Sequence, residues 1–590
     1  MLEIRDVSLI AGTMADGEPL MLLREISAHF PRGHLCAIVG PSGSGKSTFL
    51  KVIAGIREPE DGSVIWEGRD LAAEGDLDPH EVGYVPQFGI SFDLLTVAES
   101  MDTALRLRVG GLDRHARRER AMEILHDAGL DEIADRRTGV LSGGQKRRLA
   151  LAIEMATRPV LLLCDEVTSG LDTKSEDEIV DLMRRLSLDG PGRTVLSVTH
   201  SLRHLELHDS VIVLYEGRIV YHGAPDLIRH YFTIGGPEQL FDCLALRAPE
   251  EWAASWRKHR AAYYASLVNA DMPVVRADDE PVESPAVEET FDPANEVLIQ
   301  DSAPFKRPGW FTQFAVLLTR QRRLLVRDHG QLLLQLALLF GFPCLVVIFA
   351  WDGLPDIQNL TGPPSRNVVQ QIVENAAFSL QAVKVGGLVS GLVMFQVILL
   401  TLMGSNNSAR EIAGQRAIFE KEKFAGLRPS AFLASKTVYL SFILAAQSIW
   451  MALFVNTICH FPGDLLSQVG ILLAVNAAMT SMCLGISAQM KTADHASLVS
   501  VYLVGFQLPL SGAVLALPHF VGSITRPFIA AFWGWSGYLE TMRDTRFYDV
   551  VQMTSQTHLT QFAVCGWVLM GHVLAGLLLA YFGVRESRWD

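Results

Sequence analysis

The chain has 590 residues, of which 49% are hydrophobic and only 20% are charged, and its formal charge is −14. At roughly 100–200 residues per domain, this length excludes a single-domain protein. The acidic balance excludes nucleic acid as the main partner, because that affinity rests on neutralising phosphates with Lys and Arg. A charged fraction below the usual ~25% indicates that part of the chain lies in lipid.

Residues 1–242 alternate short β-branched apolar runs with helical patterns and Gly-rich turns, which predicts an α/β domain. The strand-like run Leu35–Val39 leads into a loop of the form G-x-x-x-x-G-K-[ST]. Such a loop turns backbone N–H groups onto phosphate oxygens, while Lys46 reaches the β- and γ-phosphates and the Ser47 hydroxyl binds Mg²⁺. The predicted nucleotide-binding residues of the loop are Gly40, Pro41, Ser42, Gly43, Ser44, Gly45, Lys46, Ser47 and Thr48.

A second glycine-rich stretch, Leu141–Arg148, precedes a helical pattern that continues to about Thr157. Ser142 is suited to cap this helix, and the glycines after it leave the helix N-terminus open to an anion. The stretch therefore predicts a second anion-binding helix start in the same domain.

The continuous apolar run Val160–Cys164 ends in two acids, which is typical of a buried parallel strand. Ligands of open α/β sheets bind outside the carboxyl ends of the strands. We therefore expect Asp165 to hold Mg²⁺ through its water shell and Glu166 to orient and polarise the attacking water. The alternative is a solvated turn that happens to carry two acids.

The stretch Leu141–Gln145 reads Leu-Ser-Gly-Gly-Gln and resembles the defining signature of the ATP-binding-cassette family. The order and spacing of the other motifs agree across roughly the first 220 residues. The resemblance implies ATP and Mg²⁺ as cofactors. It also implies that Gln87 belongs to the metal site, that His200 contacts the γ-phosphate and that Asp172 lies at the ATP site. The catalytic candidates are therefore Glu166, Gln87 and His200. The candidate metal ligands are Ser47, Gln87 and Asp165.

In that family the phosphate loop of one cassette faces the signature of another, whereas this chain holds one of each. The resemblance therefore implies that at least two chains associate, as a homodimer by default or with a related half-transporter. The signature residues that would meet the nucleotide of the other subunit are Ser142, Gly143, Gly144 and Gln145. The family's adenine-stacking aromatic is missing from Leu9–Met14, so the adenine contact stays open.

Residues 243–305 are predicted to be an acidic, Pro-containing linker; within it, 271–301 holds ten acidic residues and one basic residue. Residues 306–330 are predicted to form an amphipathic connecting helix on the inner membrane surface. Its Arg320, Arg323 and Arg327 are expected to face anionic lipid, and Arg322, on the apolar side, has to snorkel.

Residues 331–590 are predicted to be an all-α transmembrane domain, because six windows without Asp, Glu, Lys or Arg are long enough to cross ~30 Å of hydrocarbon. A shorter apolar stretch, 527–539, is expected to be re-entrant or interfacial. The six predicted spans are approximately 331–351, 385–404, 437–459, 466–490, 496–517 and 561–583.

The distribution of Lys and Arg residues predicts the orientation of the spans in the membrane. If residues 1–242 are cytoplasmic, the inside segments hold fifteen Lys and Arg and the outside segments hold five, as the positive-inside rule requires. We therefore expect a multi-pass protein of a plasma or inner membrane, with its ATP-binding domain and C-terminus in the cytoplasm. We expect no signal peptide before the first strand, because residues 1–9 already form a mixed polar and apolar strand-like run.

The order of cassette followed by six spans resembles the G subfamily of these transporters, which includes half-transporters for sterols, other lipids and hydrophobic drugs. The resemblance implies an ATP-driven exporter of a hydrophobic or amphipathic substrate, and a chain without a soluble substrate-binding domain fits export better than uptake. The absence of charged residues from the predicted spans also favours a hydrophobic or amphipathic substrate. The alternatives are an exporter of polysaccharide or peptide, and a membrane-tethered ATPase that drives a partner without transport. The polar residues inside the spans, more often helix–helix contacts than ligands, are Gln396, Gln447, Asn476, Gln507 and His572.

Overall fold

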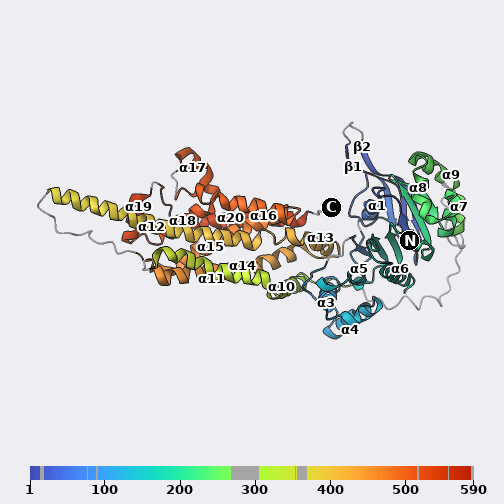
Figure 1. Ribbon diagram of the computed structural model, residues 1–590, viewed down its shortest axis with the longest axis horizontal. Helices are drawn as coiled ribbons and strands as arrows, with labels where there is room; N and C mark the ends of the chain where they lie inside the picture. Colours follow the sequence, from blue (N-terminus) through green and yellow to red (C-terminus); the bar gives the residue numbers. More distant parts are fainter. Residues whose placement is uncertain are drawn as a thin grey trace. The chain divides into compact units, whose positions relative to one another are not determined.

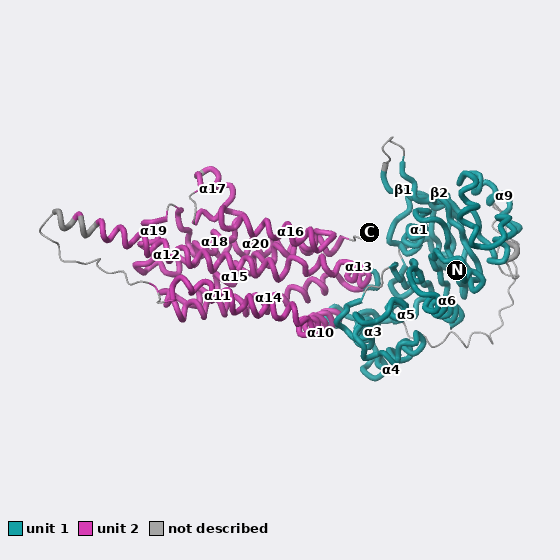
Figure 2. Tube along the Cα trace, viewed as in Figure 1, with its two compact units in different colours: residues 1–312, 424–426 teal, residues 313–423, 427–590 magenta. Residues whose placement is uncertain are grey.

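A computed structural model describes residues 1–13, 19–75, 77–87, 91–189, 192–267, 305–351, 354, 368–513, 517–555 and 557–586. The chain forms two compact units (Figure 2). Unit 1 comprises residues 1–312 and 424–426, and unit 2 comprises residues 313–423 and 427–590.

Figure 1 draws the strands of unit 1 as arrows. The larger sheet has the order β10-β9-β3-β8-β7-β6, in which β9, β3, β8, β7 and β6 run parallel and β10 is antiparallel to β9. The strands are β3 Leu35–Val39, β6 Val82–Val85, β7 Leu161–Asp165, β8 Thr194–Val198, β9 Ser210–Tyr215 and β10 Arg218–Gly223. The residues of β3, β6, β7 and β8 are all buried, as is typical of parallel strands covered on both faces of the sheet. The α/β fold predicted for the first domain is confirmed.

A second, antiparallel sheet of order β2-β1-β4-β5 completes the strands of unit 1. Its strands are β1 Leu2–Thr13, β2 Pro19–Phe30, β4 Asp61–Trp66 and β5 Arg69–Asp70. Helices α3 to α6 share one buried apolar cluster with strands of the parallel sheet. The helices of unit 1 are α1 Lys46–Ile53, α2 Leu71–Glu74, α3 Val97–Arg108, α4 Arg114–Asp127, α5 Gly143–Glu154, α6 Thr173–Leu188, α7 Ile228–Phe232, α8 Leu240–Leu244 and α9 Pro249–Leu267.

Helix α9 lies inside the range 243–305 that the sequence assigned to a linker. Its Trp252 and Trp256 are each 4% exposed, and they pack with Tyr231 of α7 at ring-centroid distances of 6.4 and 5.9 Å. This aromatic packing, which an average over the acidic composition does not reveal, makes α9 a packed helix of unit 1. The acidic segment 271–301 lies outside the described residues.

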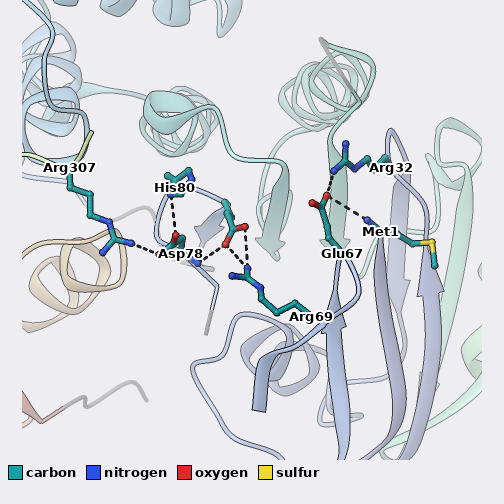
Figure 3. A network of polar contacts seen from close by, with 8 residues as sticks. Met1, Arg32, Glu67, Arg69, Asp78, His80 and Arg307 are labelled. Carbon is teal, nitrogen blue, oxygen red and sulfur yellow. Dashed lines mark hydrogen bonds and ion pairs between the residues drawn. The ribbon is translucent and has the colours of Figure 1, made fainter. Parts of the chain in front are cut away.

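The chain just before α10 is also bound to unit 1. Phe305 stacks on His80 with ring centroids 4.3 Å apart, and Gly110 N donates to Lys306 O at 2.7 Å. Figure 3 shows Arg307 directed at the carboxylate of Asp78, with which it forms an ion pair. The end of the predicted linker is therefore anchored to the first unit.

Unit 2 is helical, and its buried core joins α11, α12, α14, α15, α18, α19 and α20. Its helices are α10 Trp310–Arg327, α11 His329–Val347, α12 Val368–Ser408, α13 Arg416–Phe424, α14 Pro429–Cys459, α15 Leu465–Gln489, α16 Ala493–Gly505, α17 His519–Thr525, α18 Ala530–Glu540, α19 Arg546–Thr554 and α20 Phe562–Arg585. Helix α18 covers most of the short stretch 527–539, and its Trp535 and Tyr538 are fully buried.

Five helical segments among the described residues are long and apolar enough to cross a membrane. They are His329–Ala350, Ala376–Phe424, Pro429–Cys459, Leu465–Gln489 and Phe562–Arg585. The predicted window 496–517 differs, because α16 ends at Gly505 and a short 3₁₀ turn at Pro509–Ser511 follows. Pro509 has no N–H to donate to the carbonyl of Gly505, four residues earlier, and its ring would clash with that carbonyl, which accounts for the end of the helix at Gly505. Six spans therefore remain a prediction.

One prediction about helix α10 is wrong. Arg320, predicted to face lipid, is 6% exposed and forms an ion pair with Glu422 of α13, its Nη2 lying 2.9 Å from Glu422 Oε2. Helical periodicity places Arg320 away from the apolar stripe but does not reveal an acidic partner 102 residues later in the chain. This face of α10 therefore packs against protein.

Candidate functional site

The glycine-rich loop connects β3 to α1, as predicted. Lys46 begins α1, and its Nζ donates hydrogen bonds to Gly40 O at 2.9 Å and Pro41 O at 2.8 Å, so the ammonium closes the loop. Gly45 caps the helix with φ +98°, and a Cβ there would lie 2.8 Å from Leu22 O. Only glycine fits this turn, which keeps the backbone open to an approaching ligand.

The loop presents donors where an anion fits. Ser44 is 3% exposed, and its Oγ has no hydrogen-bond partner among the described residues. The first N–H groups of α1 also lack intrahelical acceptors, because every α-helix leaves its first turn unpaired. Burial lowers the pKa of Lys46, and the nearby Glu166 and Asp165 oppose that shift. A buried cation, an unpaired hydroxyl and a helix N-terminus together suit phosphate oxygens.

Asp165 ends β7 directly beside this loop. Ser47 Oγ donates to Asp165 Oδ1 at 2.7 Å, and the Tyr84 hydroxyl donates to Oδ2 at 3.2 Å. Burial raises the pKa of Asp165, and the hydrogen bonds from Ser47 and Tyr84 oppose the rise. A hydroxyl and a carboxylate are oxygen ligands of the kind that Mg²⁺ takes. The described residues hold no group of three His, Cys, Asp or Glu able to bind a metal, so a cation here needs further ligands from nucleotide and water.

Glu166 follows immediately and is held from two sides. Gln87 Nε2 donates to Glu166 Oε2 at 2.6 Å, and His200 Nε2 lies 2.9 Å from Oε1. Gln87 follows β6 and His200 follows β8, which are the two neighbours of β7 in the sheet. Glu166 has φ +50°, an uncommon value for a residue with a side chain. The structure thus brings together the three residues predicted to be catalytic.

The glycine-rich signature forms a well-capped helix start at α5. Ser142 Oγ accepts from Gln145 N at 3.3 Å, and Gln145 Oε1 accepts from Ser142 N at 3.0 Å. A Cβ on Gly144 would lie 2.8 Å from Ser175 Oγ of α6, so α5 and α6 approach closely at this glycine. None of the hydrogen bonds described connects the signature with the phosphate loop.

Asp172 lies at the exposed N-terminus of α6. Its carboxylate accepts hydrogen bonds from Ser175 N at 3.0 Å and Ser175 Oγ at 2.7 Å, and these lower the pKa of Asp172. Asp172 is therefore a helix cap in this structure, and its contact with ATP remains a prediction. Met14, at the end of the stretch considered for adenine, lies outside the described residues.

Tyr84 is a site residue that the sequence reasoning missed. Its hydroxyl reaches Asp165 from the neighbouring strand β6, and the side chain is 2% exposed. The sequence could have indicated Tyr84, because it is a tyrosine in a buried strand next to the strand that ends in Asp165. Its hydroxyl needs a partner because unpaired buried polar groups are costly.

Comparisons with known proteins match both halves of the chain. Residues 23–169 match the family described as ABC transporter, and residues 312–533 match the family described as ABC-2 type transporter. An ABC transporter ATP-binding/permease protein of Mycobacterium tuberculosis is 28% identical over 579 residues, or 96% of this chain. The chain spans 61% of the length of that relative.

Other relatives match a smaller share of the chain. A sulfate/thiosulfate import ATP-binding protein of Brucella melitensis is 36% identical over 37% of this chain and 61% of its own length. Among solved structures, a dimeric ATP-binding cassette bound to ADP and Pi is 29% identical. It covers 38% of this chain and 99% of its own, with a TM-score of 0.35.

Proposed function

This chain belongs to the ATP-binding-cassette (ABC) transporters, with the cassette before the membrane domain, and we propose that it hydrolyses ATP to export a hydrophobic or amphipathic molecule. The single observation that carries the proposal is the hydrogen bonding of Glu166. Its carboxylate lies between His200 and Gln87, at the carboxyl ends of parallel strands and next to the acid bonded to the phosphate loop.

In the proposed reaction, Glu166 orients the attacking water and accepts its proton, and His200 contacts the γ-phosphate. Lys46 and the N-terminus of α1 bind the β- and γ-phosphate oxygens. Mg²⁺, when bound, neutralises charge on the phosphates, and Ser47, Asp165 and Gln87 are its proposed ligands. Gln87 uses its Nε2 on Glu166, so its Oε1 is the atom available to a cation.

We propose that two chains form the complete site. Each chain supplies one phosphate loop and one signature, and no described hydrogen bond connects the two within the chain. Ser142, with the glycines at the start of α5, provides an open helix N-terminus that suits the γ-phosphate bound by a second copy or a related half-transporter.

The nature of the cargo is inferred from the spans. The six predicted windows contain no Asp, Glu, Lys or Arg, and a charged group in the membrane costs about 2.5–3.5 kcal/mol by insertion scales. Several polar side chains in the helices bond to protein, as where Asn407 Nδ2 donates to Gln447 Oε1 at 2.8 Å, whereas the buried Gln396 amide has no hydrogen-bond partner among the described residues. These features favour an apolar or amphipathic cargo that enters from the inner leaflet of a plasma or inner membrane.

Reconstitution into sealed proteoliposomes tests this function. With ATP outside, we expect chains whose cassettes face outward to move a fluorescent amphipathic lipid into the opposite leaflet, and Glu166→Gln to abolish that movement. Stimulation of ATP hydrolysis by glycans or peptides but not by lipids would support the alternative cargo. Hydrolysis without movement of any of these probes would support an ATPase that drives a partner.

A further inference from the structure

An apolar groove runs between α10 and α14 within unit 2. Its volume is about 570 Å³, which is within the range of small-molecule sites. One wall is a stripe on α10 and the other a stripe on α14, each spaced at helical intervals so that its residues share one face. The lining residues are Leu318, Thr319, Arg322, Leu325, Tyr439, Phe442, Ile443 and Ala446.

One cation in this groove has no protein counterion. Arg322 is exposed, and in the part of the chain that the structure describes its guanidinium has neither an ion pair nor a hydrogen bond. Its neighbour Arg320 is paired with Glu422. The Thr319 hydroxyl donates to Ala315 O at 2.7 Å, and Arg322 is the charged residue among those that line the groove, so its guanidinium is the group suited to recognise a charged ligand.

The position of the groove along α14 fits the inner boundary of a bilayer. Helix α14 has 31 residues and is therefore about 46 Å long, whereas the hydrocarbon core is about 30 Å thick. The charge-free window 437–459 is its C-terminal part. If the cassette is cytoplasmic, Tyr439 lies at the headgroup boundary and Ala446 lies deeper among the acyl chains.

We propose that this groove binds one anionic phospholipid of the cytoplasmic leaflet. The guanidinium of Arg322 holds the headgroup phosphate, since arginine matches phosphate geometry and charge. An acyl chain lies along Phe442, Ile443 and Ala446; the Phe442 side chain is 70% exposed. Eight lining residues are far fewer than the about 20–30 per side of a stable protein interface, which favours a lipid over a second copy of the chain.

Native mass spectrometry of the full-length protein tests the site, with phosphatidylglycerol and phosphatidylcholine of identical acyl chains as probes. We expect phosphatidylglycerol to be retained in preference to phosphatidylcholine, and Arg322→Gln to reduce that preference about fivefold. Ala446→Trp, at an exposed groove position, leaves the charge unchanged and is expected to reduce retention of both lipids.

Arg323→Gln is the matched control, because it removes the same charge from the same helix at a position that does not line the groove. Equal losses for Arg322→Gln and Arg323→Gln would show general attraction to a basic helix and overturn the proposal. Equal retention of the two lipids by the unmodified protein would also overturn it. So would a change in oligomeric state with Ala446→Trp, since that result would assign the groove to a second copy.

Discussion

Ser47 Oγ donates a 2.7 Å hydrogen bond to Asp165 Oδ1, although 118 residues separate them in the chain. The bond joins the first turn of α1 to the last residue of β7. It places Ser47 and Asp165, two of the proposed metal ligands, side by side.

Glu166→Gln is expected to lower the rate of ATP hydrolysis by about 10²–10⁴, because the amide cannot accept a proton from water. Nucleotide binding is retained, since the phosphate loop is unchanged. Steady-state phosphate release and size-exclusion chromatography with ATP measure the two effects, and we expect the variant to accumulate as an ATP-bound dimer. Glu119→Gln, on the surface of α4, is the control. Turnover at the parent rate would show that another group activates the water.

Lys46→Ala is expected to weaken ATP binding by at least about tenfold, since hydrogen bonds to charged groups contribute about 1.5–3 kcal/mol. It also removes the bonds to Gly40 O and Pro41 O that close the loop. Titration with a fluorescent ATP analogue gives the dissociation constant. Lys174→Ala removes a similar charge from the surface of α6, where the side chain is 86% exposed, and should leave the constant unchanged.

Ser44→Ala separates folding from ligand binding. The buried Ser44 hydroxyl has no partner in the described structure, so its removal is expected to leave the free energy of unfolding without ATP unchanged or slightly higher. With ATP the hydroxyl has a phosphate to bind, so affinity should fall several-fold. Thermal unfolding with and without nucleotide measures both. Destabilisation of the ligand-free protein would mean that the hydroxyl already has a partner.

Acid should destabilise unit 1 through buried histidines. Burial lowers the pKa of His34 and His208 to about 4 and of His222 to about 3. The unfolded chain takes up protons below its ordinary histidine pKa of about 6.5, whereas the folded protein does not. Stability is therefore fully present above about pH 6.5 and falls as the pH drops towards 4.

The midpoint of thermal unfolding across this pH range measures the loss. His222→Leu, at a fully buried position, is expected to make the loss of stability with falling pH less steep. His115→Leu is the control, because the His115 side chain is 91% exposed and should not change the pH dependence. An equal pH dependence in the parent and both variants would contradict this role of His222.

Lys436→Met is expected to destabilise unit 2 by about 3–5 kcal/mol, the usual effect of removing one partner from a buried ion pair. Lys436 is 3% exposed, and its Nζ donates to Glu411 Oε1 at 2.6 Å and Gln415 Oε1 at 2.9 Å. The double variant Lys436→Met/Glu411→Gln should recover most of the loss. Thermal unfolding in detergent compares the three proteins; no recovery would show that Glu411 is satisfied by other groups.

Short-range patterns predicted much of this protein. The capping box of Ser142 and Gln145 and the closed loop around Lys46 form within a few residues of chain, so local sequence determines them. Apolar windows predicted long helices for the same reason. The expectation that Gln447 and Asn476 bond between helices is also confirmed, since Asn476 Nδ2 donates to Ser448 Oγ at 3.1 Å.

Predictions failed where a distant partner decides the outcome. Arg320 faces protein because Glu422 is there, and α9 belongs to unit 1 because Trp252 and Trp256 find an aromatic cluster. The span over 496–517 stays a prediction, because its composition is continuously apolar but α16 ends at Gly505. Hydropathy averages over a window and does not register one backbone break.

The amino-acid sequence alone determined the residue types of the nucleotide site and the strand ends that carry them. Only the tertiary structure decided that Gln87 and His200 both reach Glu166, because that depends on β6 and β8 lying on either side of β7. Strand order in a parallel sheet is set by packing between segments far apart in the chain. The spacing of motifs along the chain therefore does not predict strand order.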